Sequence, residues 1–214
     1  QSFESGLGDW AVDSGVWQVG APTIGPLGAH SGTNYATTGL TGAAPGSGTS
    51  QLISPTFTVP AANQNPRLRF WHWYNFPSYS SGVVRIKVGT GAWQALSSSY
   101  TGSSGAWSQP SLDLTAYADQ SVQIGFQWTA ANAYTGPGWY IDEVTLVTGA
   151  ITTLVPNVAQ SFESGVGDWA VEGGVWEVGA PTSGPNAAHS GSNCAATVLN
   201  GDAPGSGTSQ LISP

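Results

Sequence analysis

Residues 67–74 read RLRFWHWY, and their alternation decides the fold class. In an extended strand, successive side chains point to opposite faces. One face would carry Leu68, Phe70, His72 and Tyr74, and the other would carry Arg67, Arg69, Trp71 and Trp73. Both faces hold large side chains, which is typical of a sandwich strand that is covered on both sides.

Similar short apolar runs flank this stretch on both sides and are separated by Gly, Ser, Pro and Asn. Strands are expected at 10–12, 16–19, 33–38, 51–53, 83–88, 93–95, 121–129 and 139–147. The run 121–129 sets Val122, Ile124 and Phe126 opposite Gln123, Gly125 and Gln127. No window shows a helical period, so we predict an all-β, jelly-roll β-sandwich of two antiparallel sheets.

Composition restricts the partners. The chain has 214 residues with a net charge of −8, and its four basic residues are Arg67, Arg69, Arg85 and Lys87. So few cations argue against nucleic acid and against anionic membrane surfaces. There is no signal peptide and no apolar run for membrane insertion. An acidic, lysine-poor chain is compatible with divalent cations and with neutral partners such as glycans.

The opening segment returns near the end of the chain. Residues 1–55 align without a gap to residues 160–214, and 42 of the 55 positions are identical. A period of 159 residues indicates an array of whole domains. We expect a complete module at 1–148, a linker at 149–160 and the first third of a second module at 161–214. The absence of Met predicts an excerpt of a longer polypeptide, and completion of the second module by another chain is the alternative.

The ordered motifs resemble those of bacterial MAM-like jelly-roll domains, which occur beside secreted peptidases of the immune-inhibitor-A type and in cell-surface proteins. The motifs are SFESGLGDW, WQVG, AHSGTNYA, LRFWHWY, GVVRIKVGTGAWQAL, LDLTAYADQSVQIGFQW and GWYIDEVTL. The resemblance covers nearly all of residues 2–148, although residues 75–82 lack the acid that often follows this strand in the family. It implies a β-sandwich with a structural calcium ion and a role in adhesion, carbohydrate binding or accessory support.

A calcium site is predicted where the first and last strands meet. Asp142 alternates with Tyr140, Val144 and Leu146, so its carboxylate should lie on or beside an apolar face and need hydrogen bonds or a cation. Calcium prefers six to eight oxygen ligands. Glu4, Asp142 and the loop Ser31–Asn34 offer such oxygens, and Glu163 repeats Glu4. The alternative is a solvated Glu4 and an Asp142 that accepts only backbone amides.

The aromatic residues give two open interpretations. Trp71, Trp73 and Tyr79 form a candidate ligand surface, because exposed rings stack on sugars and on proteins. They equally suit internal or inter-module packing. No nucleophile motif, carboxylate pair or metal-binding histidine spacing is present, so we expect a non-catalytic chain. Cys194 has no intrachain disulfide partner, which leaves a buried thiol or an intermolecular link.

These features predict a structural or adhesive repeat module of a long extracellular or cell-surface protein, stabilised by calcium. Its partners would be neighbouring repeats and other copies in a fibre or filament. The alternatives are a carbohydrate-binding module of a secreted enzyme, with glycans as partners, and an accessory domain of a secreted peptidase.

Overall fold

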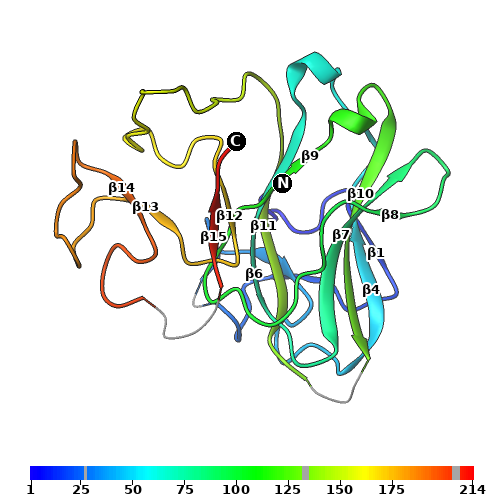
Figure 1. Ribbon diagram of the computed structural model, residues 1–214. Coiled ribbons are helices and arrows are strands. Elements are labelled where there is room, and N and C mark those ends of the chain that lie inside the picture. The colour runs from blue at the N-terminus through cyan, green and yellow to red at the C-terminus, as the bar shows by residue number, and fades with distance from the viewer. Residues whose placement is uncertain (27, 132–134, 204–207) are drawn as a thin grey trace.

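The computed structural model describes residues 1–26, 28–131, 135–203 and 208–214. Within these ranges the ordered elements are strands and two short 3₁₀ turns, η1 (Ala62–Gln64) and η2 (Thr115–Tyr117). The described residues include no helix with the length and apolarity that a membrane crossing requires. The chain is therefore an all-β structure (Figure 1).

Two antiparallel sheets form the body of the molecule. The first sheet has the order β1 (Ala11–Asp13), β4 (Ser47–Ile53), β10 (Ser121–Ala131), β7 (Ser80–Val88) and β8 (Gln94–Ala95), with β5 (Phe57–Thr58) also paired to β10. The second has the order β2 (Gln18–Gly20), β3 (Tyr35–Thr37), β11 (Gly138–Val147), β6 (Arg67–Asn75) and β9 (Ser111–Asp113). The chain passes repeatedly between the sheets, which gives a jelly-roll β-sandwich.

The core lies between the two sheets. The Phe70 ring from β6 meets the Phe126 ring from β10 edge to face, with centroids 5.0 Å apart. Phe126 also contacts Trp139 of β11, at 5.7 Å. All three side chains are fully buried. The predicted alternation in residues 67–74 is confirmed, because Leu68, Phe70, His72 and Tyr74 are buried and face this core while the residues between them point outward.

Each predicted strand has a counterpart in the structure, but the predicted facing of side chains in the last strand is wrong beyond Asp142. A β-bulge interrupts β11 between Asp142 and Thr145, and Glu143 there has a positive φ of 48°. The extra residue reverses the alternation beyond the bulge. Asp142 therefore shares the outer face of its sheet with Tyr140, but not with Leu146 as strict alternation predicts.

The second copy repeats the first locally. β12 (Ala170–Glu172) pairs with β15 (Gln210–Ile212), and β13 (Glu177–Gly179) pairs with β14 (Cys194–Ala196). Every register equals that of the β1–β4 and β2–β3 ladders with an offset of 159 residues. The opening segment thus forms the same two ladders when it is not joined to β10 and β11.

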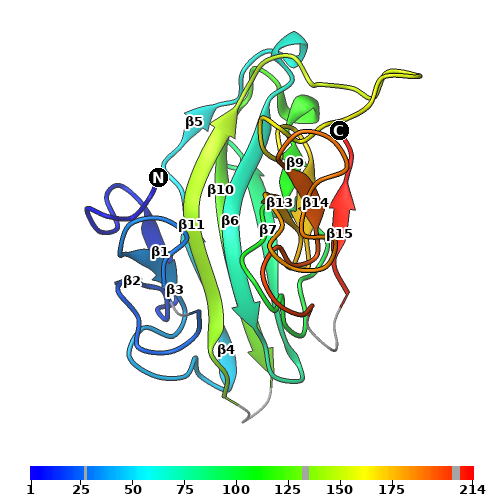
Figure 2. The same cartoon turned by 90° about the vertical axis from the view of Figure 1, so that its left-hand side faces the viewer.

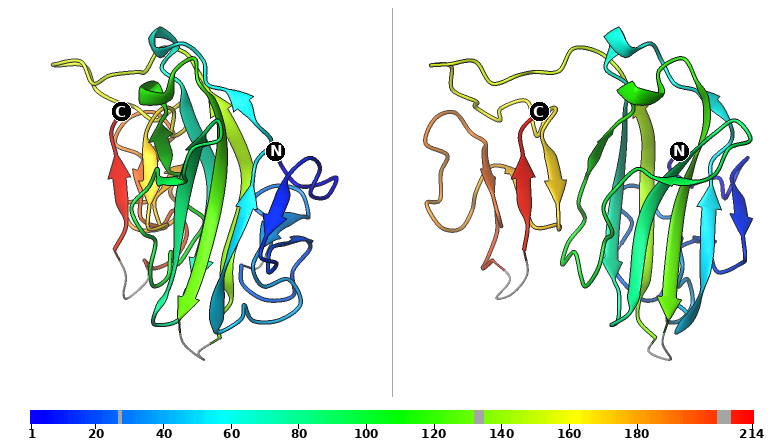
Figure 3. Two further views of the ribbon diagram at one scale, coloured as in Figure 1. Left: turned by 90° about the vertical axis from the view of Figure 1, so that its right-hand side faces the viewer. Right: turned by 45° about the vertical axis from the view of Figure 1, so that its right-hand side comes forward.

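Residues 160–203 and 208–214 lie beside β9, at one edge of the second sheet (Figures 2 and 3). The Val171 amide donates to the Gln109 carbonyl (3.1 Å), which extends this edge by one backbone hydrogen bond. Arg69 of β6 donates to the carbonyls of Gly167 (2.6 Å) and Trp169 (2.8 Å). The second copy is therefore held by the outward-pointing residues of the first.

Candidate functional site

The bulge in β11 fixes the position of the Asp142 carboxylate. Asp142 is fully buried, and its Oδ1 accepts a hydrogen bond from the Glu143 amide (2.8 Å). Its Oδ2 accepts one from the Ser31 amide (3.1 Å). Burial raises the pKa of the Asp142 carboxyl, while the two amide donors act in the opposite direction. A buried carboxylate is thus placed against the loop that contains Ser31.

The Glu4 carboxylate reaches the same loop from the other end of the module. Its Oε1 accepts hydrogen bonds from the amides of Thr33 (3.0 Å) and Asn34 (2.7 Å). The Asn34 side chain donates back to the Glu4 carbonyl (3.2 Å). Gly32 has a φ of 65°, and a Cβ there would lie 2.5 Å from the Glu4 carboxyl carbon. A glycine is therefore required for the loop to wrap around an otherwise exposed glutamate.

Backbone hydrogen bonds join the two ends of the module at this point. The amino group of Gln1 donates to the Val144 carbonyl (2.6 Å), and the Val144 amide donates to the Gln1 carbonyl (2.9 Å). As a result Glu4 from the beginning and Asp142 from the end of the module are both bound to residues 31–34. The structure brings together four of the five predicted metal ligands.

The donor set suits a hard cation that takes oxygen ligands. Two carboxylates, the Asn34 amide oxygen and the loop carbonyls are the ligand types that calcium uses. Among the described residues, neither this site nor any other contains a cluster of three or more His, Cys, Asp or Glu side chains that could hold a metal ion. The two carboxylates and the Asn34 amide match the ligand types that calcium uses, although the backbone amides already satisfy part of each carboxylate.

Glu163, the fifth predicted ligand, lies apart from this site in the second copy. Its Oε1 accepts from the amides of Ser192 (3.1 Å) and Asn193 (2.8 Å), as Glu4 does in the first copy. Asp142 has no counterpart in residues 160–214. The Glu–loop contact therefore forms from local sequence alone.

A contact between His30 and Glu143, which the sequence did not reveal, borders the site. His30 Nδ1 lies 2.6 Å from Glu143 Oε2, and the imidazole stacks on Trp71 with ring centroids 3.6 Å apart. Trp107 meets His30 edge-on and donates its Nε1–H to the Gly28 carbonyl (3.2 Å). The Glu143 carboxylate is thus partly covered by the His30 ring.

The three predicted ligand-surface residues do not form one platform. Trp71 lies beneath His30, and Trp73 packs edge-on against Tyr140 with centroids 5.3 Å apart. Tyr79 is 75% exposed and lies in the turn before β7. The predicted surface is therefore divided between a packed outer layer and one exposed ring.

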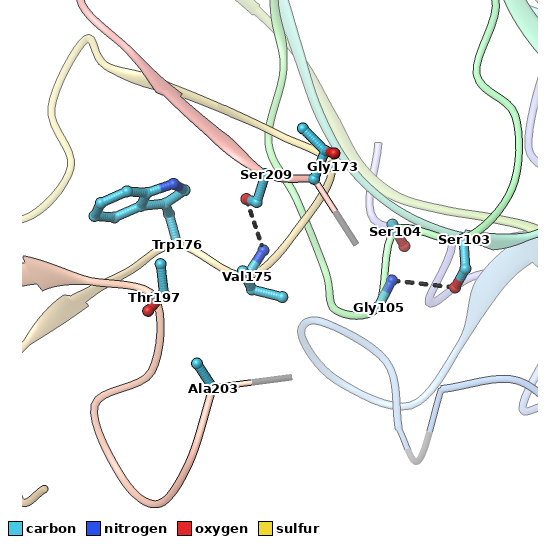
Figure 4. Close-up of a pocket in the computed structure, with 10 residues that line it drawn as sticks. Ser103, Ser104, Gly105, Gly173, Val175, Trp176, Thr197, Ala203 and Ser209 are labelled. Carbon is cyan, nitrogen blue, oxygen red and sulfur yellow. Dashed lines mark hydrogen bonds between the residues drawn. The ribbon is translucent and has the colours of Figure 1, made fainter. Parts of the chain in front are cut away.

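Two cavities separate the second copy from the first. One, of about 470 Å³, lies where His30, Trp71 and Trp107 face Val175 and Trp176. The other, of about 610 Å³, lies between the Ser103–Gly105 turn and the second copy, with Val175 and Trp176 again on its wall (Figure 4). Trp71 therefore contributes to the space between the copies and is not a free sugar platform in this arrangement.

Comparison with known proteins gives one sequence relative and several structural neighbours. No protein-family model matches the chain. It is 32% identical to Bacillopeptidase F of Bacillus subtilis (strain 168) over 151 residues, which is 68% of this chain and 10% of the relative.

Among solved structures, TmCBM61 in complex with β-1,4-galactotriose has a TM-score of 0.48 and 18% identity, covering 69% of this chain and 94% of that one. An adhesin domain of Lys-gingipain from Porphyromonas gingivalis has a TM-score of 0.48 and 17% identity, covering 70% and 97%. The chain thus resembles a domain-sized part of Bacillopeptidase F and spans about a tenth of that protein's length.

Proposed function

We propose that the chain is a non-catalytic, calcium-stabilised repeat module of an extracellular or cell-surface protein. The observation that carries this proposal is the convergence of Glu4 and Asp142 on one loop, Ser31–Asn34. The acidic side chains come from the first and last parts of the module. A cation held between them would lock the module closed at the point where its ends meet.

Calcium would supply positive charge that this chain does not provide at the site. Glu4 and Asp142 would hold it through carboxylate oxygens, with Asn34 and the Ser31 region adding neutral oxygens. The basic residues lie elsewhere, since Arg67 and Arg69 contact the second copy and Arg85 and Lys87 lie on the other sheet. The proposed role of the ion is therefore structural.

The repeat and the peptidase relative support a module that works as part of a larger protein. A structural or adhesive role, with neighbouring repeats as partners, suits two nearly identical copies in one chain. The second candidate is an accessory domain of a secreted peptidase, which the 32% identity to Bacillopeptidase F favours. Both agree with a MAM-like jelly-roll module. Filaments in electron micrographs of the full chain would favour the first, and binding to the peptidase part of a parent protein the second.

Thermal unfolding of the full chain with calcium and with chelator tests the metal site. A ligand that binds only the folded state stabilises it, by about 2.7 kcal/mol at a concentration 100 times its Kd. We expect calcium to raise the unfolding midpoint of the sandwich, and Asp142→Asn and Glu4→Gln to remove that increase. Glu163→Gln is the matched control, because it alters the same type of Glu–loop contact in the second copy. Equal midpoints in calcium and chelator would show that the amides alone satisfy both carboxylates.

A further inference from the structure

The outward side of the first sheet carries amides, hydroxyls and two cations. Side chains two residues apart on a strand share a face, so neighbouring rungs of the ladders form one surface. These rungs pair Gln51 with Gln127, Gly125 with Arg85, and Gln123 with Lys87. Residues 160–203 and 208–214 lie beside β9 on the opposite side of the sandwich (Figures 1 and 3), so the described part of the second copy does not cover this face.

Gly125 allows two neighbouring side chains to lie close to the sheet in the middle of this face. A Cβ at Gly125 would lie 2.7 Å from the Gln51 side-chain carbonyl carbon and 3.0 Å from Cζ3 of Trp93. The Gln51 amide and the Trp93 ring therefore lie over the glycine, close to the sheet. Gln51 is 5% exposed, and its buried Nε2 has no hydrogen-bond partner among the described residues. A buried, unsatisfied donor is unfavourable unless a ligand accepts from it.

Two cations lie beside Gly125, and neither has an acidic partner in the part of the chain that the structure describes. Arg85 donates to Gln127 Oε1 (3.2 Å) and to the Trp93 carbonyl (2.9 Å), which leaves further N–H groups of its guanidinium. Lys87 Nζ lies 5.1 Å from the centroid of the Trp93 ring. The carboxylate on the rung of Gln51 is Asp13, which pairs directly with Gln51 from the neighbouring edge strand β1, and β4 and β10 lie between β1 and the strand β7 that carries Arg85 and Lys87. The β7 side of the face is therefore positive, and side-chain amides lie beside it.

We infer that this face binds a polysaccharide that carries carboxylates, such as a chain of uronic acid residues. Lys87 and Arg85 would pair with carboxylates, and the Gln51 and Gln127 amides would donate to ring and hydroxyl oxygens. The Trp93 indole would contact the apolar side of a sugar ring. This inference goes beyond the proposed module function and does not depend on calcium.

The surface chemistry favours a glycan over an acidic peptide. Protein interfaces depend on buried apolar anchors that enter well-packed pockets. This face offers mostly amides, hydroxyls and cations, with Trp93 as its one indole. A flat array of polar groups suits a ligand whose own surface consists of hydroxyls, ether oxygens and carboxylates. The positive charges of Arg85 and Lys87 then favour an acidic glycan over a neutral one.

The test is calorimetric titration of the full chain with an oligogalacturonate that is too short to gel, and with its methyl ester. The two probes share one sugar backbone and differ in their carboxylate charges. We expect binding of the acid form and at least tenfold weaker binding of the ester. Arg85→Gln and Lys87→Gln should each weaken binding of the acid form at least tenfold, while Lys87→Arg retains it. Gly125→Ala, whose Cβ would displace the Gln51 amide and crowd the Trp93 ring, should also weaken binding.

Three results would overturn the inference. One is no binding of the acid form by a chain whose far-ultraviolet spectrum and unfolding midpoint are normal. Another is unchanged binding by the Arg85→Gln and Lys87→Gln variants. The third is equally tight binding of oligoglutamate, which would make this face a site for acidic peptides. Because the calcium-dependent midpoint is measured separately, failure here is distinguishable from failure of the proposed structural calcium.

Discussion

At the scale of single residues, His72 shows how the core fixes a protonation state. His72 is fully buried, and its Nδ1 accepts a hydrogen bond from Trp139 Nε1 (3.3 Å). The rings of Phe70, Tyr74 and Tyr100 surround it, with centroids 4.7–5.2 Å from the imidazole. Burial lowers the pKa of His72 from 6.5 to about 3. The imidazole is therefore neutral within the core at neutral pH.

This lowered pKa predicts a pH-dependent stability. Between about pH 6.5 and pH 3 the unfolded chain binds a proton at His72 that the folded chain excludes. The free energy of unfolding should therefore fall as the pH falls through this window, with a slope of about 1.4 kcal/mol per pH unit from this residue. Urea unfolding at a series of pH values measures the slope. His72→Gln, whose amide can still accept from Trp139, should remove this component.

His189→Gln provides the matched control for that measurement. His189 is exposed in the second copy, so its removal should leave the pH dependence of the sandwich unchanged. If wild type and His72→Gln show parallel pH profiles, the burial of a neutral His72 does not contribute to acid sensitivity.

At the same scale, the sequence anticipated the Glu4–Asp142 site but missed the polar sheet face. Glu4 and Asp142 stand in motifs that resemble a known family, so their proximity followed from the resemblance. Gln51 and Arg85, by contrast, come from strands whose registers the sequence does not specify. The alternation of Gln123, Gly125 and Gln127 was visible as an outward polar row, but nothing indicated which residues lie beside it.

At the scale of elements, β6 and β10 were predictable because their alternation extends over many residues. The short strands β5 and β9 were not, since two or three residues provide too little periodicity. The bulge in β11 also escaped, because it depends on the backbone of Glu143 and leaves no break in the apolar pattern. Sequence therefore predicts long strands well and predicts poorly the local irregularities that position functional side chains.

The two copies differ in sequence at three alternate positions in β3 and just after it. Tyr35, Thr37 and Gly39 of the first copy correspond to Cys194, Ala196 and Val198. Tyr35 is buried and contacts Tyr140 edge-on, with centroids 5.4 Å apart. The Thr37 hydroxyl accepts from the Gly39 amide (3.0 Å). A Cβ at Gly39 would lie 2.5 Å from the Pro137 carbonyl oxygen.

These contacts predict that the second-copy residues do not fit the first sandwich. A Tyr35→Cys/Thr37→Ala/Gly39→Val variant loses an aromatic contact and a hydrogen bond and gains a backbone clash. Emptying an aromatic site alone costs roughly 3 kcal/mol. We therefore expect the triple variant to unfold at clearly lower urea than wild type. Thr33→Ser and Thr41→Asn, two other differences between the copies at exposed positions, serve as the control and should change stability by less than about 0.5 kcal/mol. Stability of the triple variant equal to that of the control would mean that the two opening segments are interchangeable.

At the scale of the whole molecule, equivalent apolar residues of the two copies lie in different surroundings. Val12, Val16 and Trp17 of the first copy pack in or against the sandwich core. Their counterparts Val171, Val175 and Trp176 line the cavity beside Trp71 and Trp107 of the first module. The second copy thus presents to the first module the same side chains that the first copy packs in or against its own core. Apolar contact of this kind is not directional, so the polar groups at its margin must define the alignment.

Arg69 is the residue that we expect to fix this alignment. Its guanidinium donates to the Gly167 and Trp169 carbonyls, and Arg67 forms an ion pair with Asp168 at 3.3 Å. Hydrogen bonds from a charged donor contribute about 1.5–3 kcal/mol each. Arg69→Met keeps much of the apolar stem and removes these two bonds, together with the one that Arg69 donates to Gln109 Oε1 (2.8 Å). The Val171 amide, which donates to Gln109, should then exchange with solvent deuterium at least ten times faster, while the exchange rate of the Ile124 amide in β10 should not change.

Arg85→Gln removes a guanidinium from the opposite face and is the control for the loss of charge. An unchanged exchange rate at Val171 in Arg69→Met would assign the contact between the copies to the apolar residues alone. The relative position of the two copies would then not depend on the hydrogen bonds of Arg69.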